Sequence, residues 1–179
     1  MSNLSHQAAA AVQAADQPVC CAVLTISDTR TAETDRGGPL IRTMLTEAGH
    51  KVLEHSIVRD DLPAIAEQLD RWLTRDDLHA ILTTGGTGIA PRDTTIEVVR
   101  SRLTRELEGF GELFRMLSWE QVRASAMLSR AVAGLVVRPS GEGGDTFVFS
   151  MPGSTNAIET AMKNLIVPEL AHLVWERSR

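Results

Sequence analysis

Short apolar runs alternate with helix-like stretches along most of this chain, and this alternation constrains the fold more than any other feature. The run 19–26 precedes a helical stretch over about 38–48 and a second strand-like run, Lys51–Val58. A further helical stretch, 62–72, precedes the apolar run 80–82. Runs that are apolar throughout suit strands that are buried on both faces of a parallel sheet. The pattern therefore predicts successive β-α-β units.

The second half of the chain predicts further helices and a different strand arrangement. A short helix is expected over 94–101 and a mixed helical region over 111–128. Two strands, 133–137 and 146–151, are separated by a segment full of turn residues, so they can form an antiparallel edge. Pro168 is expected to separate or kink two final helices. The predicted class is α/β, with three layers, helices on both faces and a mostly parallel sheet.

Length and composition favour one globular domain. The chain has 179 residues, of which 43% are hydrophobic, which is enough for a single core. Residues 1–17, rich in Ala, Gln, Ser and Asn, are expected to be a loose N-terminal tail, and residues 18–179 one domain. The longest apolar stretches fall far short of the roughly 20 residues of a membrane helix, so no membrane association is expected.

Charge and cysteine content limit the partners and the compartment. The net charge of −5 argues against a protein that binds nucleic acid through a broad basic surface. An anionic ligand would have to be held locally, by backbone N–H groups, by a few Arg side chains or through a divalent cation. The two cysteines, Cys20 and Cys21, are adjacent and poorly placed to form a disulfide with each other. A reducing, cytoplasmic setting is therefore expected.

A glycine-rich loop follows the third predicted strand and is the strongest local signal. Thr84, Gly85, Gly86, Thr87 and Gly88 come directly after the apolar run 80–82 and Thr83. Glycines permit positive φ and let backbone N–H groups approach a phosphate, to which a following helix would point its positive end. The loop has neither P-loop nor dinucleotide-fold spacing. A tight turn without a ligand is the alternative.

Asp93 lies a few residues beyond this loop and has two interpretations. Thr94 with Glu97 forms a capping-box pattern for the next helix, so Asp93 could simply favour the helix dipole. Its functional interpretation is a carboxylate beside the glycine loop that holds Mg²⁺ against a phosphate or accepts a proton.

Asp60 follows the second predicted strand in the same way. Either Asp60 or Asp61 is expected to cap the helix that begins near Leu62. Asp60 lies at the carboxyl end of a strand, where it could face Asp93 and complete a two-carboxylate cation site.

Two other strand-to-helix junctions are polar. Ser27 and Asp28 follow the first strand, and Pro152, Gly153 and Ser154 follow the last. Ligand sites in parallel sheets gather beyond the carboxyl ends of the strands, so all these loops should converge on one crevice. Ser154 is at least as well explained as an ordinary helix N-cap.

The residues described above resemble the MoaB/MogA family of molybdenum cofactor biosynthesis proteins. The glycine loop 82–88 followed by Pro91, Arg92 and Asp93 resembles the family signature. The resemblance extends over about 19–175 and includes Ser27 and Asp28, 109–112 with Arg115, 129–134 and 151–154. The segments 109–116 and 152–154 resemble MoaB more closely than MogA. It implies a molybdopterin-binding type of fold.

The resemblance also implies an activity. MogA-like members transfer AMP from ATP to the terminal phosphate of molybdopterin with Mg²⁺ and two acidic residues, and Asp60 and Asp93 match those positions. We therefore expect adenylylation with Mg²⁺ as cofactor and with ATP and molybdopterin as substrates. Family members are trimers or pairs of trimers, so a homo-oligomer is expected, and an apolar final helix would suit its interface.

Two other functions fit the same residues. A non-catalytic, oligomeric molybdopterin-binding or carrier protein would need only the loops 85–88 and 152–154, not the acidic pair. Insertion of molybdate into the adenylylated pterin is disfavoured by the short chain, because that activity belongs to a related domain of larger proteins.

Overall fold

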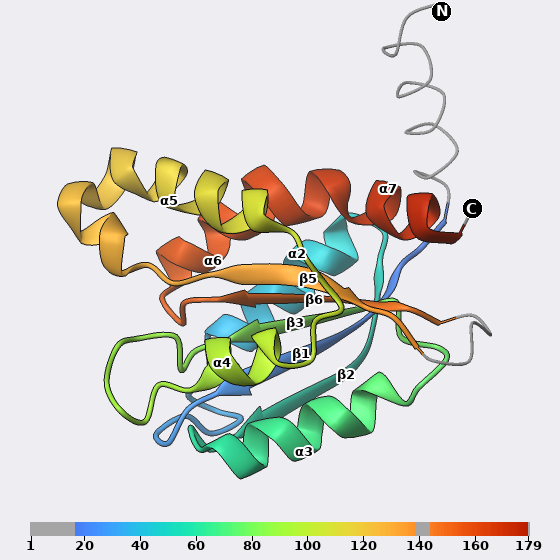
Figure 1. Ribbon diagram of the computed structural model, residues 1–179, viewed down its shortest axis with the longest axis horizontal. Helices are drawn as coiled ribbons and strands as arrows, with labels where there is room; N and C mark the ends of the chain where they lie inside the picture. Colours follow the sequence, from blue (N-terminus) through green and yellow to red (C-terminus); the bar gives the residue numbers. More distant parts are fainter. Residues whose placement is uncertain (1–16, 139–143, 179) are drawn as a thin grey trace, which may run out of the picture.

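A six-stranded sheet forms the centre of the protein, as Figure 1 shows. The computed structural model describes residues 17–138 and 144–178. The expected tail, apart from Gln17, and most of the predicted turn segment between the last two strands lie outside these residues. The strand order is β2-β1-β3-β6-β5-β4.

Four neighbouring strands are parallel, and for the first three along the chain the β-α-β pattern of the sequence predicted this. They are β2 (Lys51–Val58), β1 (Cys20–Ile26), β3 (Ala80–Thr84) and β6 (Thr146–Met151). The strand after residue 80 extends two residues beyond the predicted run, because Thr83 and Thr84 continue the pairing with β1 and β6. All five side chains of β3 are buried, as expected for a central strand covered on both faces.

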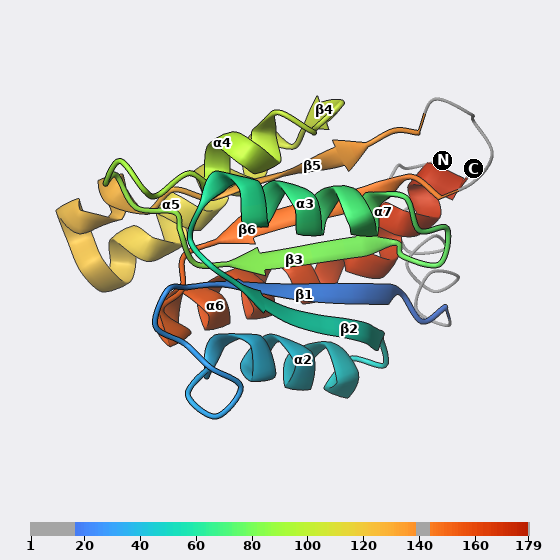
Figure 2. The same ribbon diagram turned by 90° about the horizontal axis from the view of Figure 1, so that it is seen from below.

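The antiparallel edge is also confirmed. β5 (Val132–Val136) pairs with β6 in the opposite direction, and the arrows of the two strands point opposite ways in Figure 2. A short strand that the sequence did not predict, β4 (Arg105–Glu106), pairs with the outer side of β5. Both residues of β4 are exposed, so hydrophobic periodicity gives no signal there.

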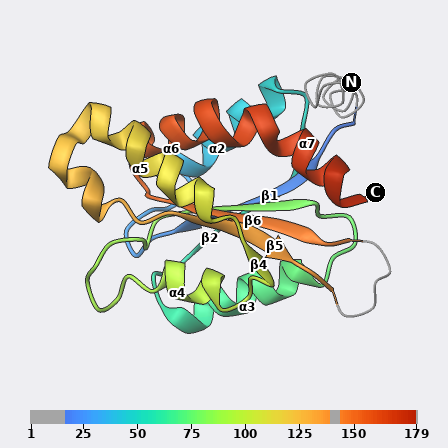
Figure 3. The same ribbon diagram turned by 45° about the horizontal axis from the view of Figure 1, so that its top comes forward.

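Helices cover both faces of the sheet and make three layers (Figures 1 and 3). One face packs against α2, α5, α6 and α7, and the other against α3 and α4. Their bounds are α2 (Gly37–Glu47), α3 (Leu62–Leu73), α4 (Thr95–Arg100), α5 (Glu108–Val122), α6 (Thr155–Ala161) and α7 (Val167–Ser178).

Alternation along β1 divides the interior into two cores. Cys21 and Val23 belong to the core under α2 and α5, whereas Ala22 and Leu24 belong to the core under α3 and α4. Successive strand side chains point to opposite faces, so a strand in the middle of three layers buries its side chains on both faces and is mostly apolar. This explains the sequence of β1, in which Thr25 is the polar exception.

The helical region predicted over 111–128 differs from the structure at both ends. α5 begins at Glu108, although Gly109 and Gly111 disfavour a helix. Phe110 and Phe114, one helical turn apart, are both buried in the core, and their packing outweighs the propensity of the glycines. After Val122 the chain continues as the 3₁₀ helix η1 (Arg123–Leu128).

The expected interruption near Pro168 takes the form of a π-helical turn. Regular α6 ends at Ala161, and η2 (Met162–Ile166) leads into α7 at Val167. Proline removes one backbone hydrogen bond of a helix, and a wider turn just before it accommodates that loss.

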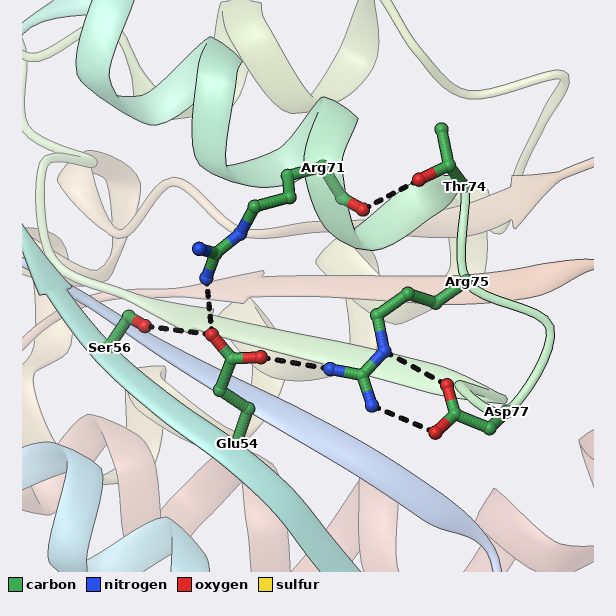
Figure 4. Close-up of polar contacts among 6 residues, drawn as sticks. All are labelled: Glu54, Ser56, Arg71, Thr74, Arg75 and Asp77. Atoms are coloured by element: carbon green, nitrogen blue, oxygen red, sulfur yellow. Dashed lines mark hydrogen bonds and ion pairs between the residues drawn. The ribbon is translucent and has the colours of Figure 1, made fainter.

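An ion-pair network joins β2 to α3 and to the loop before β3 (Figure 4). Glu54 accepts hydrogen bonds from Arg71 and Arg75, and Arg75 also forms two bonds with Asp77. These side chains are partly exposed, so the network is expected to contribute little to stability. No helix in the described part of the chain is long and apolar enough to cross a membrane.

Candidate functional site

The carboxyl ends of the four parallel strands lie side by side, and their loops meet as predicted. Ile26 is in register with Val58, and Thr84 is in register with Met151. The four loops that follow these residues therefore emerge at one edge of the sheet. They contain every predicted site residue except Thr84, which is the last residue of β3.

The loops after β1 and β2 are joined directly. The backbone N–H of Asp60 donates a hydrogen bond of 3.1 Å to Oδ1 of Asp28. Asp61, not Asp60, caps α3, because its Oδ1 accepts a 2.9 Å bond from Ala64 N. Asp61 is therefore the helix cap, and the Asp60 side chain has no part in capping α3.

Two glycines bring the β3 loop against its neighbours. Gly85 has φ of +100°, and a Cβ atom there would lie 2.2 Å from the carbonyl oxygen of Ile26. Gly86 has φ of +61°, and its Cβ would lie 2.6 Å from Oδ1 of Asp60. Both positions need positive φ and the absence of a side chain, which only glycine supplies without strain. Gly85 thus lets the loop approach the end of β1, and Gly86 makes room for Asp60.

Asp60 has an unusual environment for a carboxylate. Its Oδ1 is buried and has no hydrogen-bond partner among the described residues, and the same is true of the hydroxyl oxygens of Thr94 and Thr95. The Thr95 hydroxyl and Asp60 Oδ1 both lie close to Gly86. Burial, followed by the negative charges of Asp93 and Asp28, raises the pKa of Asp60. Buried oxygens without donors favour a ligand that supplies positive charge or hydrogen bonds.

The second acidic residue, Asp93, makes hydrogen bonds within its own turn. Its Oδ2 accepts a 2.8 Å bond from Ala90 N, and its backbone N–H donates to the carbonyl oxygen of Ala90. One carboxylate oxygen therefore stabilises the turn before α4. The negative charge of Asp93 is, after burial, the next largest cause of the raised pKa of Asp60.

The predicted capping box at Thr94 and Glu97 is wrong. Thr94 precedes α4 with ψ near 0°, and its side chain makes no cap bond. The carboxylate of Glu97 pairs with Arg130 instead. α4 has six residues, and the N–H of its first residue, Thr95, is bonded to the Gly86 carbonyl oxygen at 3.2 Å. The helix dipole thus adds little to anion binding at this loop.

A pocket of about 390 Å³ lies beside the glycine loop. From the predicted residues it takes Ser27, Thr84, Gly85, Gly153 and Ser154. Asp28, Asp60, Gly86, Thr87, Gly88, Asp93 and Pro152 do not line it. Ser154 also caps α6 by accepting a 3.2 Å bond from Ala157 N, so its structural interpretation is confirmed.

The pocket is also lined by polar residues that were not predicted from the sequence. Arg30 and Arg36 line the pocket, and arginine side chains can balance the charge of a phosphate. Asp35 is buried and accepts hydrogen bonds from Thr25 Oγ1 at 2.7 Å and from Gly37 N at 2.9 Å. The cluster of charges between Ser27 and Arg36, just after a buried strand, was the available signal.

His55 completes the buried polar group around Asp35. Its Nε2 lies 3.2 Å from Asp35 Oδ2 and 3.2 Å from Thr25 Oγ1. Burial lowers the pKa of His55, and the nearby Asp35 opposes this effect only in part. The imidazole is therefore neutral at physiological pH, and Asp35 has its hydrogen bonds satisfied beneath the pocket.

The described residues contain no cluster of three or more His, Cys, Asp or Glu side chains that could hold a metal ion by themselves. Mg²⁺ is commonly bound by one or two carboxylates together with substrate phosphates and water. Asp60, with an unpartnered buried oxygen, and Asp93 fit that incomplete kind of site. The donor set thus fits a cation that arrives with a phosphate ligand.

Known proteins match the chain over most of its length. A family described as "Probable molybdopterin binding domain" matches residues 22–172. The Molybdenum cofactor biosynthesis protein B of Staphylococcus carnosus (strain TM300) is 53% identical over 167 residues, covering 92% of this chain and 94% of that protein. The protein of the same name from Bacillus cereus is 48% identical over 166 residues, with 92% and 94% covered.

Solved structures agree with this match. A crystal structure of a Molybdenum cofactor biosynthesis protein B is 48% identical, with a TM-score of 0.84, and 91% of this chain and 98% of that chain are covered. The tungsten cofactor synthesizing protein MoaB from Pyrococcus furiosus is 32% identical, with a TM-score of 0.81, and 92% and 100% are covered. The chain therefore belongs to the MoaB/MogA family of molybdenum cofactor biosynthesis proteins.

Proposed function

We propose that this protein adenylylates the phosphate of molybdopterin, with ATP as the AMP donor and Mg²⁺ as the cofactor. The observation that supports this most is the buried Asp60 Oδ1, which has no partner among the described residues and lies against Gly86. A purely structural role does not explain this oxygen, because leaving a buried polar atom without a hydrogen bond is costly. A cation held between it and a phosphate removes that cost.

The proposed step balances without a further reactant. A phosphate oxygen of molybdopterin attacks the α-phosphorus of ATP, a new P–O–P bond forms, and the bond to the β-phosphate breaks as pyrophosphate leaves. Mg²⁺, when bound, offsets the charge that develops on the phosphates. Asp60 and Asp93 would hold it.

The other residues of the site would orient the substrates. Arg30 and Arg36 line the pocket and are suited to bind the phosphate groups of the substrates. Gly85 and Gly86 let phosphates approach the backbone of the loop. The nucleophile is already an anion, so positioning and charge balance supply most of the acceleration.

The test is AMP transfer from Mg-ATP to molybdopterin by the purified protein. Asp60→Asn and Asp93→Asn should each reduce turnover by about 10²-fold or more, the effect of losing one strong charge-stabilising group. Asp61→Asn is the matched control, because it removes the same charge one residue away while asparagine still caps α3. The control should keep its activity. Wild-type protein that binds molybdopterin and releases no pyrophosphate contradicts the proposal.

A carrier function is the second candidate, and one observation favours it. The pocket is formed by Arg30, Arg36, Gly85 and Ser154 without either Asp60 or Asp93 on its lining. It could therefore bind molybdopterin without the acidic pair. Binding that is unchanged in Asp60→Asn, together with no turnover in any form of the protein, would favour this function.

We also propose a homo-oligomer, with the interface on α5 and η1. Large apolar side chains are exposed there, including Met116 (61%), Trp119 (50%) and Met127 (80%). They surround a cavity of about 410 Å³, whose lining is almost entirely apolar apart from Arg115. Contiguous exposed apolar surface of this kind is typical of protein interfaces. Among the described residues of α7, the expected interface helix, no large apolar side chain is exposed to this degree.

Light scattering tests this interface. The wild-type protein should have a mass that is a multiple of 19.5 kDa. Replacing exposed Trp119 by Glu should shift the mass to that of the monomer, whereas Leu53→Glu, at an exposed position of the edge strand β2, should not. A monomeric wild-type protein would disprove the proposal.

A further inference from the structure

The side chain of Arg130 connects three points of the chain at the edge of the site. Its Nε donates a 2.9 Å bond to the carbonyl oxygen of Thr87, and its Nη2 donates to the carbonyl oxygens of Gly88 and, at 3.0 Å, of Asp93. Its Nη1 pairs with the carboxylate of Glu97. One planar guanidinium thus binds both ends of the segment 88–93, which we name the Asp93 loop.

The Asp93 loop needs this connection because little else orders it. Ile89, within the loop, is 73% exposed, and Ala90, Pro91 and Arg92 are also exposed. Within the loop, Ala90 and Asp93 bond to one another through the carboxylate and the backbone. These bonds shape the turn but do not fix its place relative to the sheet. Arg130 does so, because it comes two residues before β5.

The contacts of Arg130 suit arginine and not lysine. Guanidinium has five N–H donors in a rigid, planar fork, whereas an ammonium group is a compact charge on a flexible stem. A lysine at position 130 could still pair with Glu97, but it could not bind the carbonyl oxygens of Thr87, Gly88 and Asp93 at once. The side chain of Arg130 is 29% exposed, so these bonds are partly shielded from water.

We propose that Arg130 is a positioning residue for adenylyl transfer, which acts by holding the Asp93 loop, and with it the Asp93 carboxylate, in place at the edge of the site. This inference rests on the function proposed above. Arg130 does not need to touch either substrate. Its effect on turnover would pass through the placement of Asp93, and a displacement of about 1 Å in such a group can cost about 10²-fold in rate.

The first experiment measures the loop itself, without turnover. Hydrogen exchange of the backbone amides of the Asp93 loop should be at least about tenfold faster in Arg130→Lys and Arg130→Ala than in the wild-type protein. Two controls distinguish the loss of the hydrogen bonds to the carbonyl oxygens from the loss of an ion pair or of any arginine. Glu97→Gln removes the ion pair but keeps the bonds to the three carbonyl oxygens, and Arg102→Lys removes another partly buried arginine, bound to Asp70. Neither control should change exchange in the loop.

The second experiment measures turnover. Arg130→Lys and Arg130→Ala should lose about 10²-fold in kcat, with KM for molybdopterin changed by less than about threefold. Millimolar guanidinium should partly restore kcat in Arg130→Ala and should not affect Asp93→Asn. A loss of kcat in Glu97→Gln equal to that in Arg130→Ala would overturn the inference, since the ion pair would then be the important contact.

The two experiments distinguish the failure of each proposal. Wild-type protein without AMP transfer disproves the adenylyltransferase function, and with it the positioning role in catalysis. Unchanged exchange of the Asp93 loop in Arg130→Lys and Arg130→Ala disproves the role of Arg130 even if the wild-type protein is active. Melting temperatures identify any variant that fails to fold. If Arg130→Ala does not fold, Arg130→Lys tests the inference in its place.

Discussion

The carboxylate of Asp28 accepts a hydrogen bond from the backbone N–H of Asp60, across 32 residues of sequence. This bond joins the loops after β1 and β2 and holds the backbone of Asp60 in place. Asp28→Ala should therefore raise the Mg²⁺ concentration for half-maximal thermal stabilisation, with an ATP analogue present, by about tenfold. Asp28→Asn retains an acceptor oxygen and should change it much less. Equal effects of the two variants would show that charge, and not the hydrogen bond, is important.

The charge of Asp60 should destabilise the protein when no cation is bound. Burial and the charges of Asp93 and Asp28 raise the pKa of Asp60 above its ordinary 3.8. The folded state then binds this proton more tightly than the unfolded state, so stability is lost as the pH rises through the folded pKa. Asp60→Asn should remove this loss and raise the Tm at neutral pH by about 2 °C, a small gain because solvent screens the charge of a partly exposed side chain. A lower Tm in Asp60→Asn at neutral pH contradicts the expectation.

Gly86 should tolerate no side chain, because of space as well as backbone conformation. A Cβ there would lie 2.2 Å from the Thr95 hydroxyl and 2.6 Å from Asp60 Oδ1. Gly49 is a matched control, since its φ of +85° is also positive but its Cβ would have no atom within 4 Å. Gly49→Ala should cost about 1 kcal/mol in urea unfolding and keep activity. Gly86→Ala should lower the free energy of unfolding by more than Gly49→Ala does and should abolish AMP transfer. Similar results for the two variants would show that lack of space at Gly86 is not important.

His55 should make the protein sensitive to mild acid. Burial lowers its pKa below the ordinary 6.5, so the unfolded state takes up a proton first as the pH falls. The contribution of neutral His55 to the free energy of unfolding is therefore fully present above pH 6.5 and is lost as the pH falls toward the pKa of the folded state. His55→Gln should flatten this part of the stability curve, measured by urea unfolding at each pH. The pKa of His50 is also lowered by burial, so His50→Gln should flatten it independently.

Much of the fold could be predicted from the sequence because burial on both faces leaves a clear pattern. The runs of β1 and β3 are apolar since each is covered by helices on two sides. α3 was equally clear, because Ile65, Leu69 and Trp72 fall on one helical face. β4 could not be found, since a two-residue exposed edge strand has no hydrophobic pattern.

Only part of the site could be predicted, because some of its contacts join residues that are far apart in the sequence. Asp60 and the glycine loop follow strands directly, so the parallel topology placed them together. The cap of α3 could not be assigned between Asp60 and Asp61 without knowing which side chain faces the helix. The capping pattern at Thr94 and Glu97 was misleading, because Arg130, 33 residues away, binds Glu97. No local pattern reveals such a long-range contact.

The direction of β5 has a consequence for how the site can be built. In a wholly parallel sheet, the residues that enter a strand lie at the edge remote from the ligand. β5 runs in reverse, with its first residue, Val132, opposite Ser150 near the end of β6. The segment entering β5 therefore arrives at the ligand edge and brings Arg130 with it. One inverted strand thus lets the site recruit groups from both incoming and outgoing polypeptide, which a uniform strand polarity would forbid.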